Sequence, residues 1–278
     1  MVAAYALEIR FLRSFTSCET IRPFSVAANV SRHELWVGGE FGVNVFDTTT
    51  GRLKQTLKLP QSKLANGANG ANGFGGYVAL DARTSDVFVL DGQGCFHVYS
   101  EQGSVRKFVP KVPKPGASSS GAAIQSGQLF VSNGSEVCVL NPYGTLLRQY
   151  TRLIDHYRFA VAPNGELFLS EPKTKVVAVV DSNGDILRVL GFGLLRCPSS
   201  IAFDRSGNVL VCDEKQYCVF ALDPLHGQLV YKLDSFSPSA QMDTGNGVGA
   251  YARGICVDSD GDIYVSEWFD NRVSVFGF

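Results

Sequence analysis

Short runs of apolar residues recur along the chain and are separated by polar turns. Six of these runs hold three consecutive residues that favour strands, at 35–37, 87–89, 129–131, 167–169, 209–211 and 263–265. Their centres lie 52, 42, 38, 42 and 54 residues apart. A repeat of about 40 residues that holds several strands is typical of a propeller blade. No segment keeps a 3.6-residue period, so we expect almost no helix.

Gly, Asp and Asn mark the turns between the predicted strands. In the last repeat, strands at 254–257, 263–266 and 272–276 are separated first by the turn 258–262, DSDGD. The two widest spacings contain insertions rich in Gly, Asn or Ser, at 65–76 and 234–250. We expect both insertions to be surface loops.

The chain ends just after the third strand of the last repeat, so this repeat lacks a fourth strand. The segment 7–15 resembles the fourth strands of other repeats and precedes the first repeat. We therefore predict an all-β, six-bladed propeller of four-stranded antiparallel blades, whose ring is closed when this N-terminal strand completes the C-terminal blade. The predicted single domain, 1–278, has blades at 19–60, 74–110, 118–152, 156–192, 197–234 and 251–278 with 7–15.

The last repeat has the most specific motif in the chain. Residues 253–276 read RGICVDSDGDIYVSEWFDNRVSVF, which resembles an NHL repeat: Gly-Ile-Ala-Val-Asp, a glycine turn, Tyr-Val-Ala-Asp, Asn-Arg-Val and Val-Phe. Residues 198–204 with 210–213 resemble a weaker copy. The family resemblance, to the NHL domain of TRIM-type proteins, implies a propeller that binds protein or RNA.

The composition is that of a globular protein with no dominant charge. Hydrophobic residues make up 45% and charged residues 18%, and the formal net charge is −1. No apolar stretch is long enough to suggest a membrane span. The seven Cys include no C-x-x-C pair, so we expect reduced thiols, no cofactor and a cytoplasmic location.

Charged residues fall into distinct parts of the predicted ring. Lys and Arg on the outermost strands fit the protection of exposed edges. Acids in the turns within blades fit turn chemistry. Four acids share one position just after the second strand: Asp91, Glu171, Asp213 and Glu267. We expect their carboxylates to accept backbone hydrogen bonds in the turn.

If those acids are used internally, the face around the channel presents basic and aromatic side chains. The predicted binding residues are Arg22, Phe41, Tyr77, Tyr157, Arg158, Lys173, Arg196, Lys215, Arg253, Trp268, Phe269 and Arg272. Such a set suits a peptide hot spot or the phosphates and bases of RNA. The prediction is a monomeric, non-enzymatic scaffold for a protein or peptide, with RNA binding as the alternative.

Arg22, Arg158 and Arg253 are expected at similar depth in the channel, where like charges repel. Either Glu171, Asp213 and Glu267 turn inward and pair with them, or the mouth binds an anion. Both alternatives stay open on the sequence.

A catalytic site finds little support in the sequence. The predicted starts of the first strands contain no carboxylate, and the four His, at 33, 97, 156 and 226, do not gather. We therefore predict no enzyme, no catalytic residue and no metal site, and keep a propeller hydrolase or lyase as the less favoured alternative.

Overall fold

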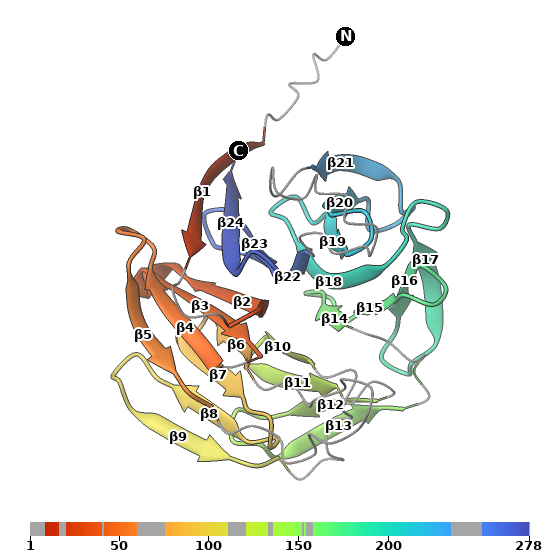
Figure 1. Ribbon diagram of the computed structural model, residues 1–278. Helices are drawn as coiled ribbons and strands as arrows, with labels where there is room; N and C mark the ends of the chain where they lie inside the picture. The colour runs from red at the N-terminus through yellow and green to blue at the C-terminus, as the bar shows by residue number, and fades with distance from the viewer. Residues whose placement is uncertain are drawn as a thin grey trace, which may run out of the picture.

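The computed structural model describes residues 9–16, 21–40, 42–59, 76–110, 121–132, 136–151, 153, 158–234 and 252–277. They form six four-stranded antiparallel sheets and one turn of 3-10 helix, Val30–Arg32. The sheets surround a common axis (Figure 1), which confirms the predicted all-β, six-bladed propeller. The predicted insertions lie almost wholly outside the described residues. Within the described residues, no helix combines the length and the apolar character needed to cross a bilayer.

Five blades follow chain order from the axis outward. Blade one is β2 (Pro23–Asn29), β3 (Glu34–Gly39), β4 (Gly42–Asp47) and β5 (Leu53–Leu57). Blade two is β6 (Tyr77–Asp81), β7 (Asp86–Leu90), β8 (Phe96–Tyr99) and β9 (Val105–Phe108). Blade three is β10 (Gly121–Gln125), β11 (Gln128–Ser132), β12 (Val137–Leu140) and β13 (Leu146–Tyr150). Blade four is β14 (Arg158–Val161), β15 (Leu167–Glu171), β16 (Val176–Val180) and β17 (Ile186–Leu190). Blade five is β18 (Pro198–Phe203), β19 (Val209–Asp213), β20 (Cys218–Leu222) and β21 (Leu229–Leu233).

Blade six joins the two ends of the described chain. It consists of β22 (Ala252–Val257), β23 (Ile263–Glu267), β24 (Arg272–Gly277) and, outermost, β1 (Arg10–Thr16). Strand β1 runs antiparallel to β24, with Phe15 opposite Val273, and the two lie side by side in Figure 1. The prediction that the N-terminal strand closes the ring is confirmed.

The core lies between the blades. The inner strands are apolar on both faces because each face packs against a neighbouring blade; all five residues of β16 are buried, for example, whereas β17 is mostly exposed. One hydrophobic cluster fills each of the six blade interfaces. Each fully buried Val, Leu or Phe contributes about 1.5–3 kcal/mol, so the interfaces hold the ring rigid.

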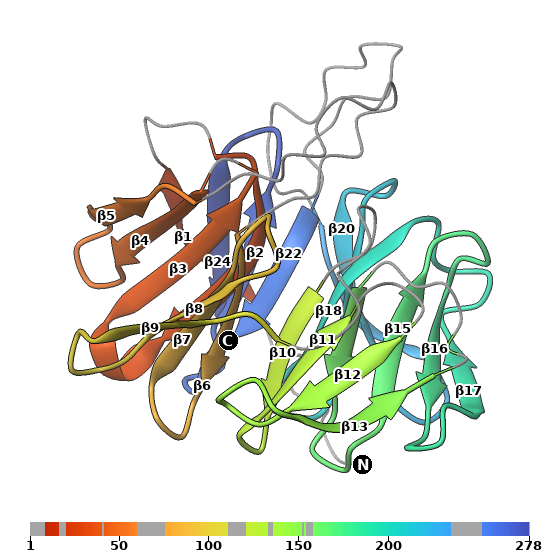
Figure 2. The same cartoon turned by 90° about the horizontal axis from the view of Figure 1, so that it is seen from below.

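The innermost strands β2, β6, β10, β14, β18 and β22 surround the axis of the ring (Figure 1), which Figure 2 shows from the side. Residues of all six strands line a central channel. We call the end where these strands begin the mouth, and the end where they finish the far end. The strands approach one another closely: a Cβ atom on Gly254 of β22 would lie 2.7 Å from the carbonyl oxygen of Phe24 on β2.

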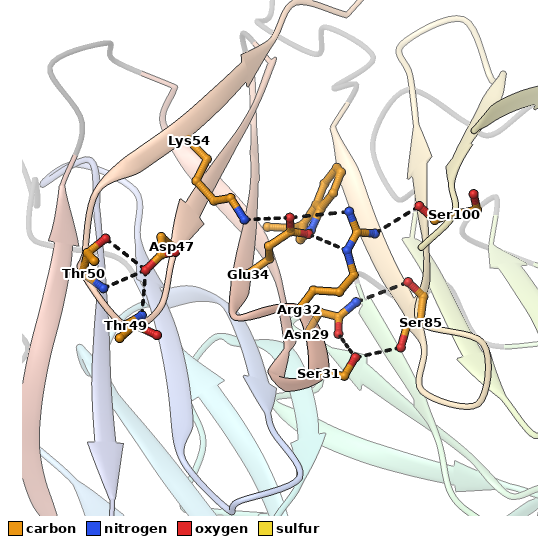
Figure 3. A network of polar contacts seen from close by, with 11 residues as sticks. Asn29, Ser31, Arg32, Glu34, Asp47, Thr49, Thr50, Lys54, Ser85 and Ser100 are labelled. Atoms are coloured by element: carbon orange, nitrogen blue, oxygen red, sulfur yellow. Dashed lines mark hydrogen bonds and ion pairs between the residues drawn. The ribbon is translucent and has the colours of Figure 1, made fainter. Parts of the chain in front are cut away.

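A polar network at the far end joins blades one and two (Figure 3). The buried carboxylate of Glu34 accepts hydrogen bonds from Arg32, Lys54 and the indole of Trp36. Asn29 donates to the carbonyl of Ser85 in blade two at 3.2 Å. Both oxygens of the Glu34 carboxylate therefore accept hydrogen bonds within the protein, so the role of Glu34 is to stabilise the fold.

Candidate functional site

Three arginines reach the mouth from different blades, although not at the similar depth that the sequence predicted, because their exposure ranges from 8% to 48%. Arg22 precedes β2, and Asn271 fixes it there because its side-chain oxygen accepts the backbone N–H groups of Ile21 and Arg22 at 2.9 and 3.2 Å. Arg158 begins β14, where its N–H donates to the hydroxyl of Ser170 at 2.9 Å. Arg253 lies on β22. Side-chain acceptors thus fix the backbone of Arg22 and Arg158, and strand β22 fixes that of Arg253.

The Arg158 side chain crosses the channel. Its guanidinium carbon lies 4.9 Å from the ring centre of Tyr77 in blade two and 5.8 Å from that of Phe24 in blade one. Blades one and four face each other across a six-membered ring, so a contact between them spans the opening. Arg158 is only 8% exposed, and these two rings support its charge through cation–π contacts.

A second stack covers the mouth beside Arg158. The indole of Trp268 lies between two guanidiniums, 5.0 Å from that of Arg22 and 4.5 Å from that of Arg253. The ring of Phe269 meets the indole edge to face at 4.5 Å. The side chain of Arg22 is 48% exposed and that of Arg253 is 20% exposed. The mouth is therefore layered, with Arg22 and Phe269 outermost.

Glu214 is a carboxylate held within this cluster beside Arg253. It follows β19, and its backbone N–H donates to the carbonyl of Cys197 at 3.0 Å. Its Oε1 lies 3.3 Å from Nε of Arg253, while the side chain is 10% exposed. Among the described residues, no hydrogen-bond donor serves this oxygen. Glu214 is thus a nearly buried acid that is close to positive charge but poorly solvated.

The surroundings of Glu214 change its acidity. Burial raises the pKa of the Glu214 carboxyl above its ordinary value, and the nearby charges of Arg253 and Arg158 only partly oppose this effect. Asp213 adds a smaller raising effect. A carboxylate with a raised pKa is a stronger base once it is deprotonated.

The channel below this cluster is a cavity of about 320 Å³. Its wall is formed mostly by small and apolar residues of the innermost strands, and Phe24, Tyr77 and Arg158 also line it. This volume is at the lower end of the range typical of small-molecule sites. The polar groups of the site are therefore gathered at the mouth.

The other predicted site residues spread over the same end of the ring. Lys173, Arg196 and Lys215 are exposed in turns. Arg272 is turned inward and binds the buried carboxylate of Glu267 at 2.7 Å. Phe41 and Tyr157, together with His156, lie outside the described residues.

The repeated acids mostly have the predicted turn role. The carboxylates of Asp91, Glu171 and Asp213 accept backbone N–H groups of their own or adjoining turns. Glu267 differs, because it binds the side chains of Arg272 and Ser274.

Two of the mouth arginines have carboxylate partners other than these repeated acids, so the structure meets the pairing alternative with different acids. Arg22 pairs with Glu40 at 3.3 Å, and Arg253 pairs with Glu214. Sequence reasoning missed Glu214 because it searched only the first strands for carboxylates.

One group of side chains in the described residues has the donor atoms of a metal site. Asp91, Cys95 and His97 offer a carboxylate oxygen, a sulfur and an imidazole nitrogen that all lie within 4.8 Å of one another. The group is in blade two and shares no residue with the arginine cluster.

Comparison with known proteins supports the predicted repeat. The family model described as NHL repeat matches residues 250–276, the same segment that carries the motif. The resemblance to the domain of TRIM-type proteins has no separate support. A search of curated proteins found no match.

Many solved structures share the fold. A streptogramin B lyase matches with a TM-score of 0.65 and 12% identity, over 97% of each chain. A catalytically inactive variant of virginiamycin B lyase from Staphylococcus aureus, solved with quinupristin, matches with a TM-score of 0.64 and 12% identity, over 98% of this chain and 100% of that one. A protein of unknown function from Bacteroides caccae matches with a TM-score of 0.61 and 17% identity, over 84% and 82%. At these identities the likeness shows the fold alone.

These matches correct two predictions from the sequence. The chain was expected to be a non-enzymatic scaffold for protein, peptide or RNA, yet propellers that match it over nearly its whole length are lyases. The argument against catalysis also fails on the geometry, because Glu214 brings a carboxylate to the mouth from the turn after a second strand.

Proposed function

We propose that this chain, which is an NHL-repeat β-propeller, is an enzyme of the lyase class that works at the channel mouth with Glu214 as its proton-transferring group. The observation that carries the proposal is the nearly buried Glu214 carboxylate with a raised pKa, placed close to Arg253 and influenced by Arg158. An acid whose pKa is shifted by burial beside specific charges is typical of a catalytic site.

The arrangement suits removal of a proton from a carbon next to a carbonyl group. Glu214 takes the proton, and the electron pair of the broken C–H bond forms a carbon–carbon double bond. The bond from the neighbouring carbon to an ester oxygen breaks, and that oxygen leaves as part of a carboxylate. No oxidant or water is consumed, so the reaction is an elimination.

The two arginines suit the negative charge that moves in this reaction. Charge develops first on the carbonyl oxygen and then on the departing carboxylate, and guanidinium groups bind both kinds of oxygen well. Arg158 is held across the channel by Tyr77 and Phe24, so little reorganisation is needed. Trp268 and Phe269 offer aromatic surface for the rest of the substrate.

The test is turnover of cyclic esters, with quinupristin among them because a matching structure contains it. Elimination opens such a ring without changing its mass, whereas hydrolysis adds one water, so mass spectrometry separates the two reactions. Glu166→Gln is a suitable control because Glu166 is paired with Arg188 in blade four, outside the mouth cluster.

We expect ring opening without added mass by the native protein and by Glu166→Gln, and loss of turnover in Glu214→Gln. Failure of the whole ester panel, or turnover that survives in Glu214→Gln, would overturn the proposal.

A further inference from the structure

The turn between β7 and β8 in blade two brings three different kinds of metal-ligating atom together. Asp91 directly follows β7, Cys95 precedes β8, and His97 lies on β8. Oδ2 of Asp91 and Nε2 of His97 are 2.8 Å apart, and both side chains are buried. The sulfur of Cys95 lies within 4.8 Å of the other two ligand atoms.

Backbone hydrogen bonds fix the acid in place. Oδ1 of Asp91 accepts the N–H groups of Gln93 and Cys95 at 2.9 Å each, and the N–H of Asp91 donates to the carbonyl of Cys95. Gly94 closes the turn with φ of 82°, a conformation that favours glycine. One carboxylate oxygen is thus used by the turn, and the other faces His97.

The turn itself does not require the cysteine or the histidine. Turns at 141–145 and 181–185 have the same hydrogen-bond pattern around Asn141 and Asp181. Neither has a Cys at the fifth position or a His two residues later. The convergence of Asp91, Cys95 and His97 is therefore an addition to an ordinary turn.

We propose that Asp91 Oδ2, Cys95 Sγ and His97 Nε2 bind a divalent cation of the zinc class. Oxygen, sulfur and nitrogen donors in one small site suit zinc, which accepts all three and prefers four ligands. Three protein ligands leave one position for water. The site lies in blade two and is independent of the catalytic proposal for Glu214.

Only a small rearrangement is needed for the cation to enter. Two ligands at about 2.0–2.1 Å from a tetrahedral zinc are about 3.4 Å apart. The Asp91 and His97 atoms, now joined by a hydrogen bond, must separate by about half an ångström, and the Cys95 sulfur, which lies within 4.8 Å of both, must take a place about 3.6 Å from each. The cation also has to displace the thiol proton, because burial and Asp91 raise the pKa of Cys95 while Lys107 opposes this effect.

The experiment is a titration of the full chain with Co²⁺ after treatment with a chelator. Cobalt bound by a thiolate has a strong charge-transfer absorption, and Zn²⁺ abolishes it by displacement. We expect one equivalent of Co²⁺ to produce this absorption and Zn²⁺ to raise the Tm. The control is Cys138→Ala, which removes a buried thiol of blade three outside the cluster.

Cys95→Ser should lose the absorption, and His97→Gln should weaken Co²⁺ binding at least tenfold while circular dichroism stays native. The control should keep both the absorption and the Zn²⁺-dependent rise in Tm. An absent band in the native protein, or a band that survives in Cys95→Ser, would overturn the site. If either cluster variant fails to fold, the other variant decides.

Discussion

Glu214 at the mouth differs from two acids at the far end of the channel, although its exposure is similar to that of one of them. At the far end, Glu34 receives three side-chain hydrogen bonds, and the carboxylate of Asp258 accepts two backbone N–H groups and the hydroxyl of Tyr264. At the mouth, Glu214 is as buried as Glu34, at 8% exposed each, but no donor among the described residues serves its Oε1. The comparison separates acids that hold the fold from an acid that is available for chemistry.

The largest expected effect is on catalysis at the mouth. Glu214→Gln keeps the shape of the side chain but removes the proton acceptor, so we expect turnover to fall about 10²- to 10⁴-fold. The free energy of unfolding should stay the same or rise, because the raised pKa of Glu214 means that the folded state disfavours the charged carboxylate. Steady-state kinetics and urea denaturation measure the two effects.

Asp258→Asn gives the matched result for the far end. It should leave turnover unchanged and lower stability, because Asn accepts the turn hydrogen bonds less strongly. Equal losses of turnover in the two variants would remove the distinction between the ends.

The second expected effect concerns Glu267, an acid on the mouth side whose carboxylate accepts hydrogen bonds from Arg272 and Ser274. Burial raises the pKa of Glu267 from 4.5 to about 7, despite its hydrogen bonds with Ser274 and Arg272. Because the folded pKa exceeds the unfolded one, Glu267 contributes stability below about pH 4.5 that is lost as the pH rises through about 7. The loss is up to about 3 kcal/mol.

Urea denaturation at several pH values, with Glu267→Gln for comparison, measures this contribution. The fall in stability with rising pH should be smaller in the variant. A parallel pH dependence in both proteins would show that Glu267 does not titrate as described.

The network in Figure 3 provides a third expected effect, on stability alone. Glu34→Gln leaves Arg32 and Lys54 without their carboxylate, and we expect a loss of about 2 kcal/mol. Turnover should not change, since the network lies at the far end. A loss of turnover without a loss of stability would contradict the assignment of this end to structure.

The smallest expected effect comes from the aromatic stack at the mouth. Trp268→Leu removes the cation–π contacts with Arg22 and Arg253, each worth about 0.5–1 kcal/mol. We expect KM to rise a few-fold while kcat changes less, because the indole holds the arginines and does not transfer a proton. An unchanged KM would place Trp268 outside the substrate path.

The fold could be predicted because each blade repeats its pattern of apolar runs and turn residues. The missing fourth strand of the last blade and the unassigned N-terminal strand together predicted the closure by β1 and β24. The burial pattern could be predicted as well. Every inner strand packs against a neighbouring blade on each face, so its sequence is a continuous apolar run.

The candidate site was predicted only in part. The sequence placed its arginines and Trp268 near the mouth, where the structure has them, but it did not point to Glu214. A side chain that reaches the mouth from the turn after a second strand leaves no periodic signal. One signal was present in the sequence. Asp213 already supplies the acid that the turn needs, so the turn does not explain the second acid, Glu214. The residues at the position of Glu214 in other blades are Gly92, Pro172 and Trp268, and none of them is acidic. The spacing of Asp91, Cys95 and His97 was also visible, but the search for C-x-x-C pairs passed over it.

The most direct test of the proposed role of Glu214 is a measurement of its pKa. NMR observes the titration of its carboxyl carbon, and Glu214→Gln assigns the signal. We predict a pKa above the ordinary 4.5, and a further rise in Arg253→Met, because the positive charge that opposes the burial effect is removed. A pKa at or below 4.5, or one that Arg253→Met leaves unchanged, would contradict the claim that the mouth holds a desolvated acid ready for proton transfer.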